Sequence, residues 1–422
     1  MTSEKKNLLE NFLSLGALQI ISYVIPLISL PYLSRVLGVE KFGLVFFAFA
    51  FMQYFIILTD YGFGLSATRE IAVNRHNQNN LSNIFNSVTI IKLILLFVSF
   101  CVLTLACIFV PKLNENWIVF QLSFLMVVGN AIYPVWFFQG MERMKYITFL
   151  NILSKTIFLI LIFIFIKRDS DYMWVPLLNS MGFLVAGALG MFFAIKEFNI
   201  KLYLPKWNSI KKQFKYSSEF FLSRVSVSAY TNTNSFCLGL IGSTLMVGYY
   251  VAAEKIYQAI SGIQTPITQA LYPFVSKNKD INTYKKWFKI AVLGNIIVCT
   301  FVFVCAKWII AIFYGSEMLE AYKILRIFCL VTLITFPSIL LGYPLLGAMG
   351  HTKIANGSVI TGSIIHIIGL ALLFVIGKMN VYSIASMVLI TESVVFAIRV
   401  FSVLKYKLLN IKENKWKIMQ SF

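Results

Sequence analysis

The chain has 422 residues, of which 59% are hydrophobic and only 13% are charged. Soluble proteins carry about 25% charged residues on average, so this composition excludes a water-soluble globular protein and indicates a membrane protein throughout. The 37 Lys and Arg against 17 Asp and Glu give a net charge of +20. In a membrane protein this excess is interpreted relative to the bilayer, and we expect no nucleic-acid partner.

Apolar stretches long enough to cross a bilayer recur along the whole chain. Seven contain no charged residue, and they cover residues 11–34, 93–111, 116–141, 172–195, 256–276, 327–350 and 354–377. Five more contain one or two charges, and they are centred near Met52, Leu159, Ser228, Val298 and Leu389. We therefore predict an all-α polytopic membrane protein with twelve transmembrane helices. A transmembrane β-barrel is excluded because the apolar runs are continuous and do not alternate.

The basic residues divide unequally between the two sides of this predicted topology. The side that carries both termini receives 23 of the 37 Lys and Arg, whereas the opposite side receives six. By the positive-inside rule, this asymmetry predicts that both termini lie in the cytoplasm. The first apolar run has no small-residue cleavage site, so we expect it to be a retained span.

The longest basic connection, residues 196–215, lies at the midpoint of the chain and indicates an internal duplication. Two sets of residues share the same spacing at an offset of 210: Pro134, Gly140 and Arg143, and Pro344, Gly350 and Lys353. An even number of spans in each half predicts parallel repeats about a pseudo-two-fold axis along the membrane normal, with the substrate between the halves. The alternative is a chance match, because Pro and Gly are common in membrane helices.

These observations predict four parts of the chain. Residues 1–195 form an N-terminal six-helix bundle, and residues 196–215 form a basic cytoplasmic linker. Residues 216–404 form a C-terminal six-helix bundle, and residues 405–422 form a basic cytoplasmic tail.

Basic residues inside the predicted spans are candidates to hold an anionic ligand, and they are Lys92, Lys155, Arg224, Lys255 and Arg326. A charge within a bilayer costs about 2.5–3.5 kcal/mol on insertion scales, so such residues normally face a cavity or a partner. Arg224 is favoured for the lumen because hydroxyl-bearing residues share its helical face. Gln258 lies on a similar polar face of the eighth span. The alternative for each cation is snorkelling or helix packing.

Three carboxylates in the predicted spans are candidates for coupling transport to H⁺ or Na⁺, or for gating it: Asp60, Glu254 and Glu392. Carboxylates cannot snorkel far, and they protonate in a dry environment. The alternative is structural pairing, since Glu254 lies beside Lys255 and Glu392 is placed to reach His366. We expect no metal ion or other cofactor, because the three His residues are scattered and no P-loop is present.

Five motifs in the chain carry a resemblance to a known family. They are Leu30-Pro-Tyr-Leu-Ser-Arg-Val-Leu-Gly38, Thr59-Asp60-Tyr-Gly-Phe63, Ser66-Ala-Thr-Arg-Glu-Ile71, Ala252-Ala-Glu-Lys-Ile256 and Gln269-Ala-Leu-Tyr-Pro273. Through them the chain resembles, from residue 8 to beyond 400, the bacterial O-antigen and capsule repeat-unit flippases. That family belongs to the multidrug, oligosaccharidyl-lipid and polysaccharide exporter superfamily.

The resemblance implies a V-shaped, MATE-like pair of six-helix bundles in the bacterial inner membrane. Such a protein moves undecaprenyl-diphosphate-linked oligosaccharide from the cytoplasmic to the periplasmic leaflet by alternating access through a cationic lumen. The positions of matching chemistry in this chain are Lys92, Lys155, Arg224, Lys255 and Arg326. The implied partners are the lipid-linked oligosaccharide, membrane lipids, and the chain polymerase and length regulator of the same pathway.

Two other functions remain open at this point. A cation-coupled multidrug exporter of the same superfold usually has an acidic cavity, whereas this chain has an excess of buried bases. A membrane glycosyltransferase or polymerase needs a sizeable external loop with catalytic residues, and none of the predicted loops is long enough. We therefore expect a transporter rather than an enzyme.

Overall fold

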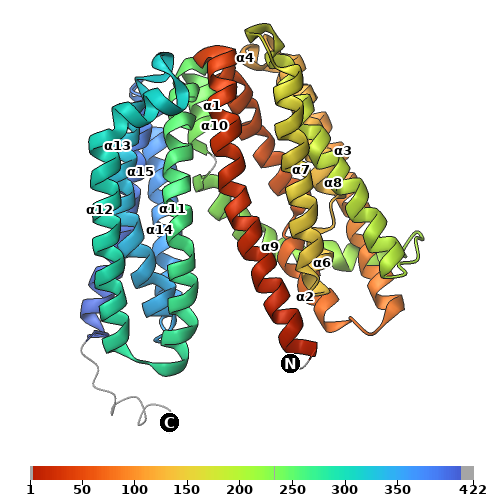
Figure 1. Cartoon of the computed structure of the whole chain (residues 1–422). Helices are drawn as coiled ribbons and strands as arrows, with labels where there is room; N and C mark the ends of the chain where they lie inside the picture. The colour runs from red at the N-terminus through yellow and green to blue at the C-terminus, as the bar shows by residue number, and fades with distance from the viewer. Residues whose placement is uncertain (1–2, 232, 410–422) are drawn as a thin grey trace. The chain divides into compact units, whose positions relative to one another are not determined.

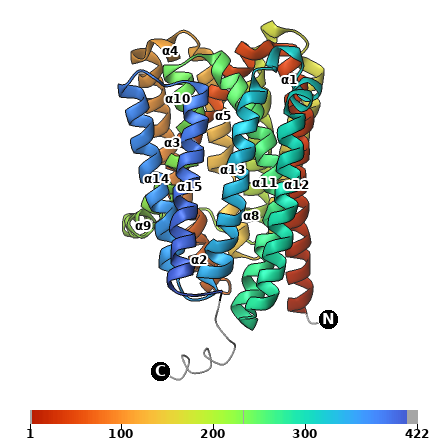
Figure 2. The same cartoon turned by 90° about the vertical axis from the view of Figure 1, so that its left-hand side faces the viewer.

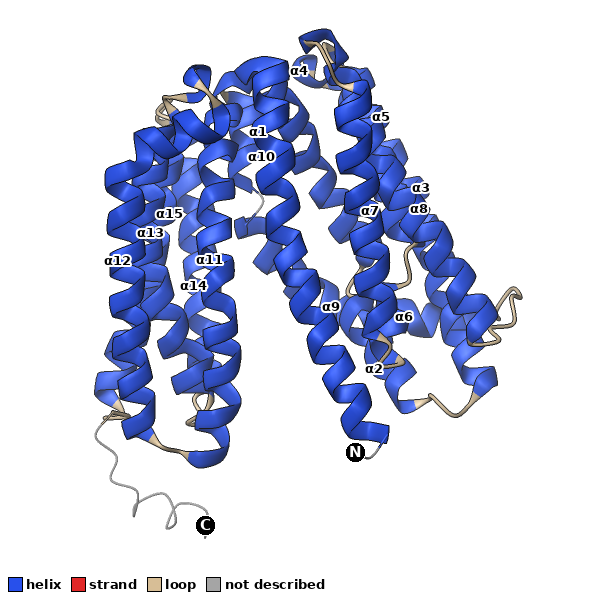
Figure 3. Ribbon diagram, in the orientation of Figure 1, coloured by secondary structure: helices blue, strands red, loops and turns tan. Residues whose placement is uncertain are grey.

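The computed structural model describes residues 3–231 and 233–409, and it describes the side chains of residues 24–221 and 233–409. Within these residues the chain forms helices joined by short loops, and no strand is present (Figure 3). A helix pairs its own backbone N–H and C=O groups, which is what a lipid-facing segment requires. The prediction of an all-α polytopic membrane protein is confirmed.

The described helices follow one another as the colours of Figure 1 show. They are α1 (Ser3–Asp60), α2 (Phe63–Val73), α3 (Gln78–Phe109), α4 (Pro111–Asn114), α5 (Trp117–Ile132), α6 (Val135–Gly140), α7 (Met144–Phe165), η1 (Asp169–Met173), α8 (Trp174–Glu197), α9 (Trp207–Thr231), α10 (Thr233–Ile241), α11 (Thr244–Asn278), α12 (Ile281–Tyr314), η2 (Ser316–Met318), α13 (Ala321–Leu341), η3 (Gly342–Gly347), α14 (Thr352–Val375) and α15 (Val381–Lys405).

The first helix, α1, contains two predicted spans that are joined without a loop. The helix is kinked at Gly38, which has φ of 71° and ψ of 170°. A residue with a Cβ rarely adopts this conformation, so the glycine permits the chain to turn and resume a helix at once.

Nine helical stretches of the described residues are long and apolar enough to cross a membrane. The first, Val24–Val73, runs through the Gly38 kink and therefore combines the first two predicted spans. The seventh and eighth predicted spans, α9–α10 and α11, are not among the nine, because polar side chains recur along them and lower their hydropathy. With α1 divided and these two added, the helix order accommodates the twelve predicted segments.

The chain divides into two compact units, residues 1–248 and 249–422. In the first unit α8 packs against both α5 and α7, and buried residues of α2, α3, α6, α7 and α8 form one core. The helix α9 also belongs to this unit. The Ser217 and Ser66 hydroxyl oxygens lie 2.7 Å apart, and the rings of Phe214 and Phe221 stack on Tyr61.

The predicted linker and the observed division differ in position. Residues 198–206 are non-helical, but α9 begins at Trp207, so the last nine residues of the predicted 196–215 linker are helical. Because aromatic and hydroxyl groups of α9 contact α2, the seventh predicted span packs with the first unit. The observed boundary therefore lies after residue 248.

In the second unit α13 packs against α12 and α15, and α14 packs against α15 (Figure 2). Its core includes Val275, Tyr284, Leu345 and Val403. The ring hydroxyl of Tyr284 donates a 3.0 Å hydrogen bond to the Leu340 carbonyl, which fixes α12 against α13.

Two prolines from the predicted repeat mark similar interruptions in the two units. Pro134 separates α5 from α6, and Pro344 lies in η3, a short π-helical segment that follows α13. Proline removes a backbone donor and clashes with the preceding helical turn, so both interruptions have the same local cause. This local likeness agrees with the predicted duplication.

Candidate functional site

The junction between α1 and α2 places Asp60. The helix α1 ends at Asp60, and the next two residues adopt left-handed conformations, with φ of 43° at Tyr61 and 78° at Gly62. A Cβ at Gly62 would lie 2.8 Å from the Phe220 Cβ and from the Phe221 nitrogen, so no larger residue fits the turn. The turn leaves the Asp60 carboxylate beside Gly64, in the first turn of α2, where the helix dipole favours a negative charge.

Asp60 and Lys92 line one cavity of about 420 Å³ within the first unit. Its lining residues come from α1, α2, α3, α5, α6 and the α5–α6 junction: Ile56, Ile57, Asp60, Gly64, Leu65, Lys92, Asn130, Tyr133, Val135, Trp136 and Gln139. The Lys92 side chain is only 4% exposed, and its ammonium interacts electrostatically with the Asp60 carboxylate. The fold therefore brings together Asp60, which was predicted for coupling or gating, and Lys92, which was predicted to hold an anionic ligand.

Asp60 and Lys92 are the two charged residues among those that line the cavity. A buried ammonium loses its hydration, and a nearby carboxylate compensates part of that loss. A second anion that entered the cavity would compete with Asp60 for Lys92.

The polar residues Asn130, Tyr133 and Gln139 complete the cavity, and sequence reasoning did not identify them. The Tyr133 hydroxyl donates to the Ile147 carbonyl at 3.1 Å and accepts from the Asn151 amide at 3.3 Å. All three lie within five residues of Pro134. The helix interruption that this proline predicts was the one feature of the sequence that could have identified them.

In the second unit Lys255 and Gln258 contact each other along α11. The Lys255 Nζ donates a 3.1 Å hydrogen bond to the Gln258 Oε1, and both side chains are half-buried. Glu254 is also half-buried and interacts electrostatically with Lys255. The predicted roles of these three residues in a lumen stay predictions.

Arg326 lies between α12 and α13 in the second unit. Its Nε donates to the Phe303 carbonyl at 3.2 Å, and its guanidinium lies 5.1 Å from the ring centres of Phe303 and Tyr322. These contacts are those of an arginine that joins two helices.

The remaining predicted residues lie in different places. Lys155 is a half-buried residue of α7, and Glu392 is a half-buried residue of α15 that interacts electrostatically with Tyr257. His366 is fully buried and shares a 3.0 Å hydrogen bond with Thr391, the neighbour of Glu392. The side chain of Arg224 lies outside the described residues.

A further intramembrane cation, Arg399 on α15, was not singled out from the sequence. It is 6% exposed, and its guanidinium donates to the Ser358 hydroxyl at 2.9 Å, to the Ser338 carbonyl at 2.9 Å and to the Ser338 hydroxyl at 3.2 Å. These bonds join α15 to α13 and α14, so Arg399 stabilises the second unit.

Among the described residues, no group of three or more His, Cys, Asp or Glu is arranged to hold a metal ion.

Comparison with known sequences gives a family match and named relatives. A family model described as "Polysaccharide biosynthesis protein" matches residues 8–279. A candidate O-antigen transporter of Escherichia coli (strain K12) is 33% identical over 285 residues, which are 68% of this chain and 69% of that protein. A candidate O-antigen transporter of Shigella dysenteriae is 29% identical over 372 residues, which are 86% and 91% of the two chains.

Solved structures share the fold at low sequence identity. A lipid II flippase, MurJ, in an inward closed conformation gives a TM-score of 0.71 at 16% identity, covering 94% of this chain and 87% of that chain. An inward-facing multidrug resistance MATE family transporter of the MOP superfamily gives a TM-score of 0.67 at 15% identity, covering 94% and 98%. The MATE-like fold is confirmed. The named relatives and fold neighbours are transporters and flippases, in agreement with a transporter rather than an enzyme.

Proposed function

Because the chain belongs to the polysaccharide biosynthesis protein family, we propose that it is a flippase for lipid-linked oligosaccharide repeat units. Its substrate is an oligosaccharide on undecaprenyl diphosphate, which it carries from the cytoplasmic to the periplasmic leaflet for O-antigen or capsule biosynthesis. The protein lies in the bacterial inner membrane with both termini in the cytoplasm. The repeat units then pass to the chain polymerase and length regulator of the same pathway.

The observation that carries this proposal is the pairing of Asp60 with Lys92 in one cavity. A diphosphate loses its hydration when it leaves water. An ammonium in a membrane-spanning unit compensates part of that loss by its attraction to the phosphate charges. The names of the two relatives support the choice of an O-antigen precursor over a drug as substrate.

The pair also suggests how the site receives its substrate. The diphosphate displaces the Asp60 carboxylate from the Lys92 ammonium, and Asp60 returns to Lys92 when the diphosphate leaves. Entry and exit of the ligand are thus linked through a single exchange of partners.

The test uses a strain without its own copy of the gene, complemented with Asp60→Asn, Lys92→Gln or both changes together. Each single variant is expected to lower surface polysaccharide at least tenfold at unchanged membrane level of the protein. The double variant contains no uncompensated charge, so a merely structural pair predicts recovery of export in it. We expect the double variant to remain inactive, and its recovery would overturn the exchange mechanism.

A second ion pair serves as the matched control. The Lys323 ammonium donates to the Glu320 carboxylate at 2.7 Å, and both side chains are about half exposed, at 46% and 50%. The double variant Glu320→Gln/Lys323→Gln removes the same two charges outside the cavity and is expected to export like the parent.

A further inference from the structure

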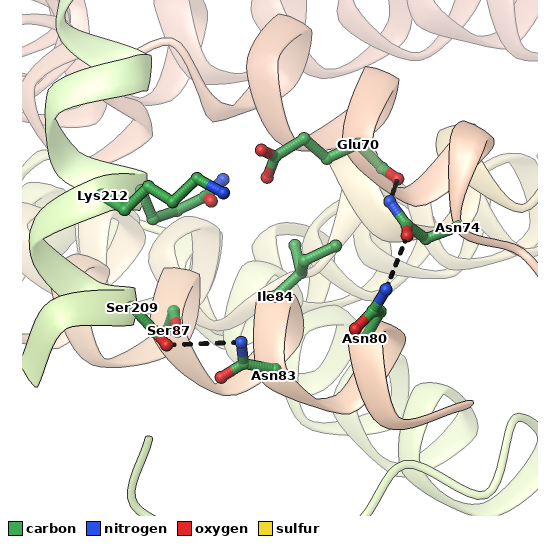
Figure 4. Close-up of a pocket in the computed structure, with 9 residues that line it drawn as sticks. Glu70, Asn74, Asn80, Asn83, Ile84, Ser87, Ser209 and Lys212 are labelled. Carbon is green, nitrogen blue, oxygen red and sulfur yellow. Dashed lines mark hydrogen bonds between the residues drawn. The ribbon is translucent and has the colours of Figure 1, made fainter. Parts of the chain in front are cut away.

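A second polar pocket of about 240 Å³ lies within the first unit, between α2, α3 and α9 (Figure 4). Most of its lining is polar, and Ile84 is its one apolar lining residue among those described. The polar lining residues are Glu70 and Asn74, then Asn80, Asn83 and Ser87 on α3, and Ser209, Lys212 and Gln213 on α9. The pocket shares no lining residue with the Asp60–Lys92 cavity.

Three polar atoms at this pocket are buried without a hydrogen-bond partner among the described residues: Glu70 Oε2, Ser87 Oγ and Gln213 Nε2. Ser87 is 2% exposed and Gln213 is 5% exposed, so neither is solvated as a surface side chain would be. Buried polar groups in folded proteins are nearly always paired, and three unpaired groups at one pocket therefore indicate a ligand that pairs with them.

The other polar groups at the pocket are held in place by neighbours. The Asn80 amide donates to the Asn74 Oδ1 at 2.9 Å, the Asn74 amide donates to the Glu70 carbonyl at 2.8 Å, and the Asn83 amide donates to the Ser209 hydroxyl at 3.4 Å. Figure 4 shows Lys212 extending from α9 toward the Glu70 carboxylate on α2. The fixed groups give the pocket a defined shape, and Lys212 is an exposed residue of its lining.

The unpaired atoms define the chemistry of the ligand. Glu70 accepts hydrogen bonds, the Gln213 nitrogen donates them, and the Ser87 hydroxyl does both. One carboxylate and one ammonium give a lining of zero net charge. A metal cation is disfavoured by the Gln213 nitrogen and by Lys212, and a diphosphate is disfavoured by Glu70. Hydroxyl groups, each of which both donates and accepts, match all three atoms.

We propose that this pocket binds one neutral sugar ring of the repeat unit. This inference rests on the proposed function and adds a glycan subsite to it. The volume is below the usual range of about 300–1,000 Å³ for drug-sized ligands, which suits a single ring rather than an oligosaccharide. The side chain of Ile84 supplies apolar surface for one face of that ring.

The test is saturation-transfer NMR on the purified full-length protein in lipid nanodiscs, with the methyl glycosides of glucose, galactose and N-acetylglucosamine as probes. At least one glycoside is expected to give a signal with the parent. Gln213→Leu and the near-isosteric Glu70→Gln are expected to reduce that signal at least fivefold, with unchanged gel-filtration profiles. Glu219→Gln, an exposed carboxylate on the same helix α9, is the matched control and is expected to retain the signal.

Three results would overturn the subsite: no signal with any of the glycosides, the parent signal retained in both pocket variants, or displacement of the signal by inorganic diphosphate. The export assay separates the two proposals. A parent gene that fails to restore surface polysaccharide contradicts the flippase function, whereas restored export with an unchanged sugar signal in the pocket variants contradicts the subsite alone.

Discussion

Gly62 is the residue on which the position of Asp60 depends. An alanine at this position must adopt φ near 78° and place its Cβ against the Phe220 side chain and the Phe221 backbone. We expect Gly62→Ala to lower the free energy of unfolding by about 1–3 kcal/mol, the usual cost of a strained left-handed residue.

Thermal unfolding of the purified protein measures this loss, and the matched control is Gly294→Ala. Gly294 lies inside α12, and a Cβ built there meets no atom within 4 Å beyond its chain neighbours and the backbone of its own helical turns. The control is expected to leave the unfolding temperature unchanged or raise it slightly, because alanine favours helix. Equal effects of the two substitutions would contradict the tight turn at Gly62.

Arg75 and Glu142 form an ion pair whose strength depends on pH. The Arg75 guanidinium donates to the Glu142 carboxylate at 2.7 Å and to the Gly140 carbonyl at 2.7 Å. The hydrogen bond from Arg75 lowers the pKa of Glu142 below its ordinary value of about 4.5. The stabilisation is therefore fully present above pH 4.5 and is lost as pH falls through the lowered pKa.

The difference in unfolding temperature between the parent and Glu142→Gln is expected to be small and constant from pH 7 to pH 5 and to vanish in more acidic solution. The contribution stays below about 1 kcal/mol, because the Glu142 side chain is 60% exposed and water screens the pair. Glu115→Gln, at an exposed position in the α4–α5 loop, is the control. A difference in unfolding temperature between the parent and Glu142→Gln that grows toward low pH would contradict this prediction.

At the scale of the helices, the interruption at Pro134 determines the shape of the Asp60–Lys92 cavity. Pro134→Ala restores a backbone donor and removes the clash that separates α5 from α6, so the two helices can become continuous. A continuous helix rotates and shifts Trp136 and Gln139 relative to Lys92. We expect export to fall at least fivefold with unchanged protein level.

Pro176→Ala is the matched control for this prediction. Pro176 is buried near the beginning of α8, where proline is tolerated because the first helical N–H groups have no partner within the helix. Export by this variant is expected to equal that of the parent. If Pro134→Ala also exports like the parent, the helix interruption has no part in transport.

The sequence predicts the helices better than it predicts their contacts. Apolar stretches with at most two charges identify α3, α7, α8 and α12–α15 directly, since lipid requires a helix wherever such a stretch crosses it. Asp60 and Lys92 were each identified as charges in apolar surroundings. Their pairing depends on the turn at Gly62 and on how α3 packs beside α1, which periodicity along one helix does not reveal.

The pocket proposed to bind a sugar ring was beyond sequence analysis for the same reason. Ser87 and Gln213 have ordinary polar side chains, and they lie 126 positions apart in the chain. Only the packing of α9 on α3 makes them neighbours. Arg399 differs from these residues because its charge is conspicuous in an apolar stretch of the sequence. The serine hydroxyl and the carbonyl that accept its hydrogen bonds lie on two other helices, so its role depends on the packing.

At the scale of the whole molecule, the charge asymmetry predicts topology. Residues 198–206 are non-helical, and with both termini they are expected to lie in the cytoplasm. A green fluorescent protein fused after Lys201 is expected to fluoresce, and an alkaline phosphatase at the same position is expected to be inactive. The two reporters should reverse when fused after Ser170, in the loop predicted on the opposite side. Phosphatase activity after Lys201 would contradict the twelve-span topology.

The membership of α9 and α10 in the first unit bears on the order in which the protein is made. A ribosome completes the first six predicted spans before it synthesises the helices that cover Tyr61 and Ser66. Until then this face of α2 lacks its final contacts, and the weakly apolar α9 enters the membrane after the helices that it packs against. Assembly of the first unit is therefore completed by a segment from the second half of the chain. A gene divided at the midpoint would yield two incomplete products. A gene divided after residue 248 would instead separate the two packed units.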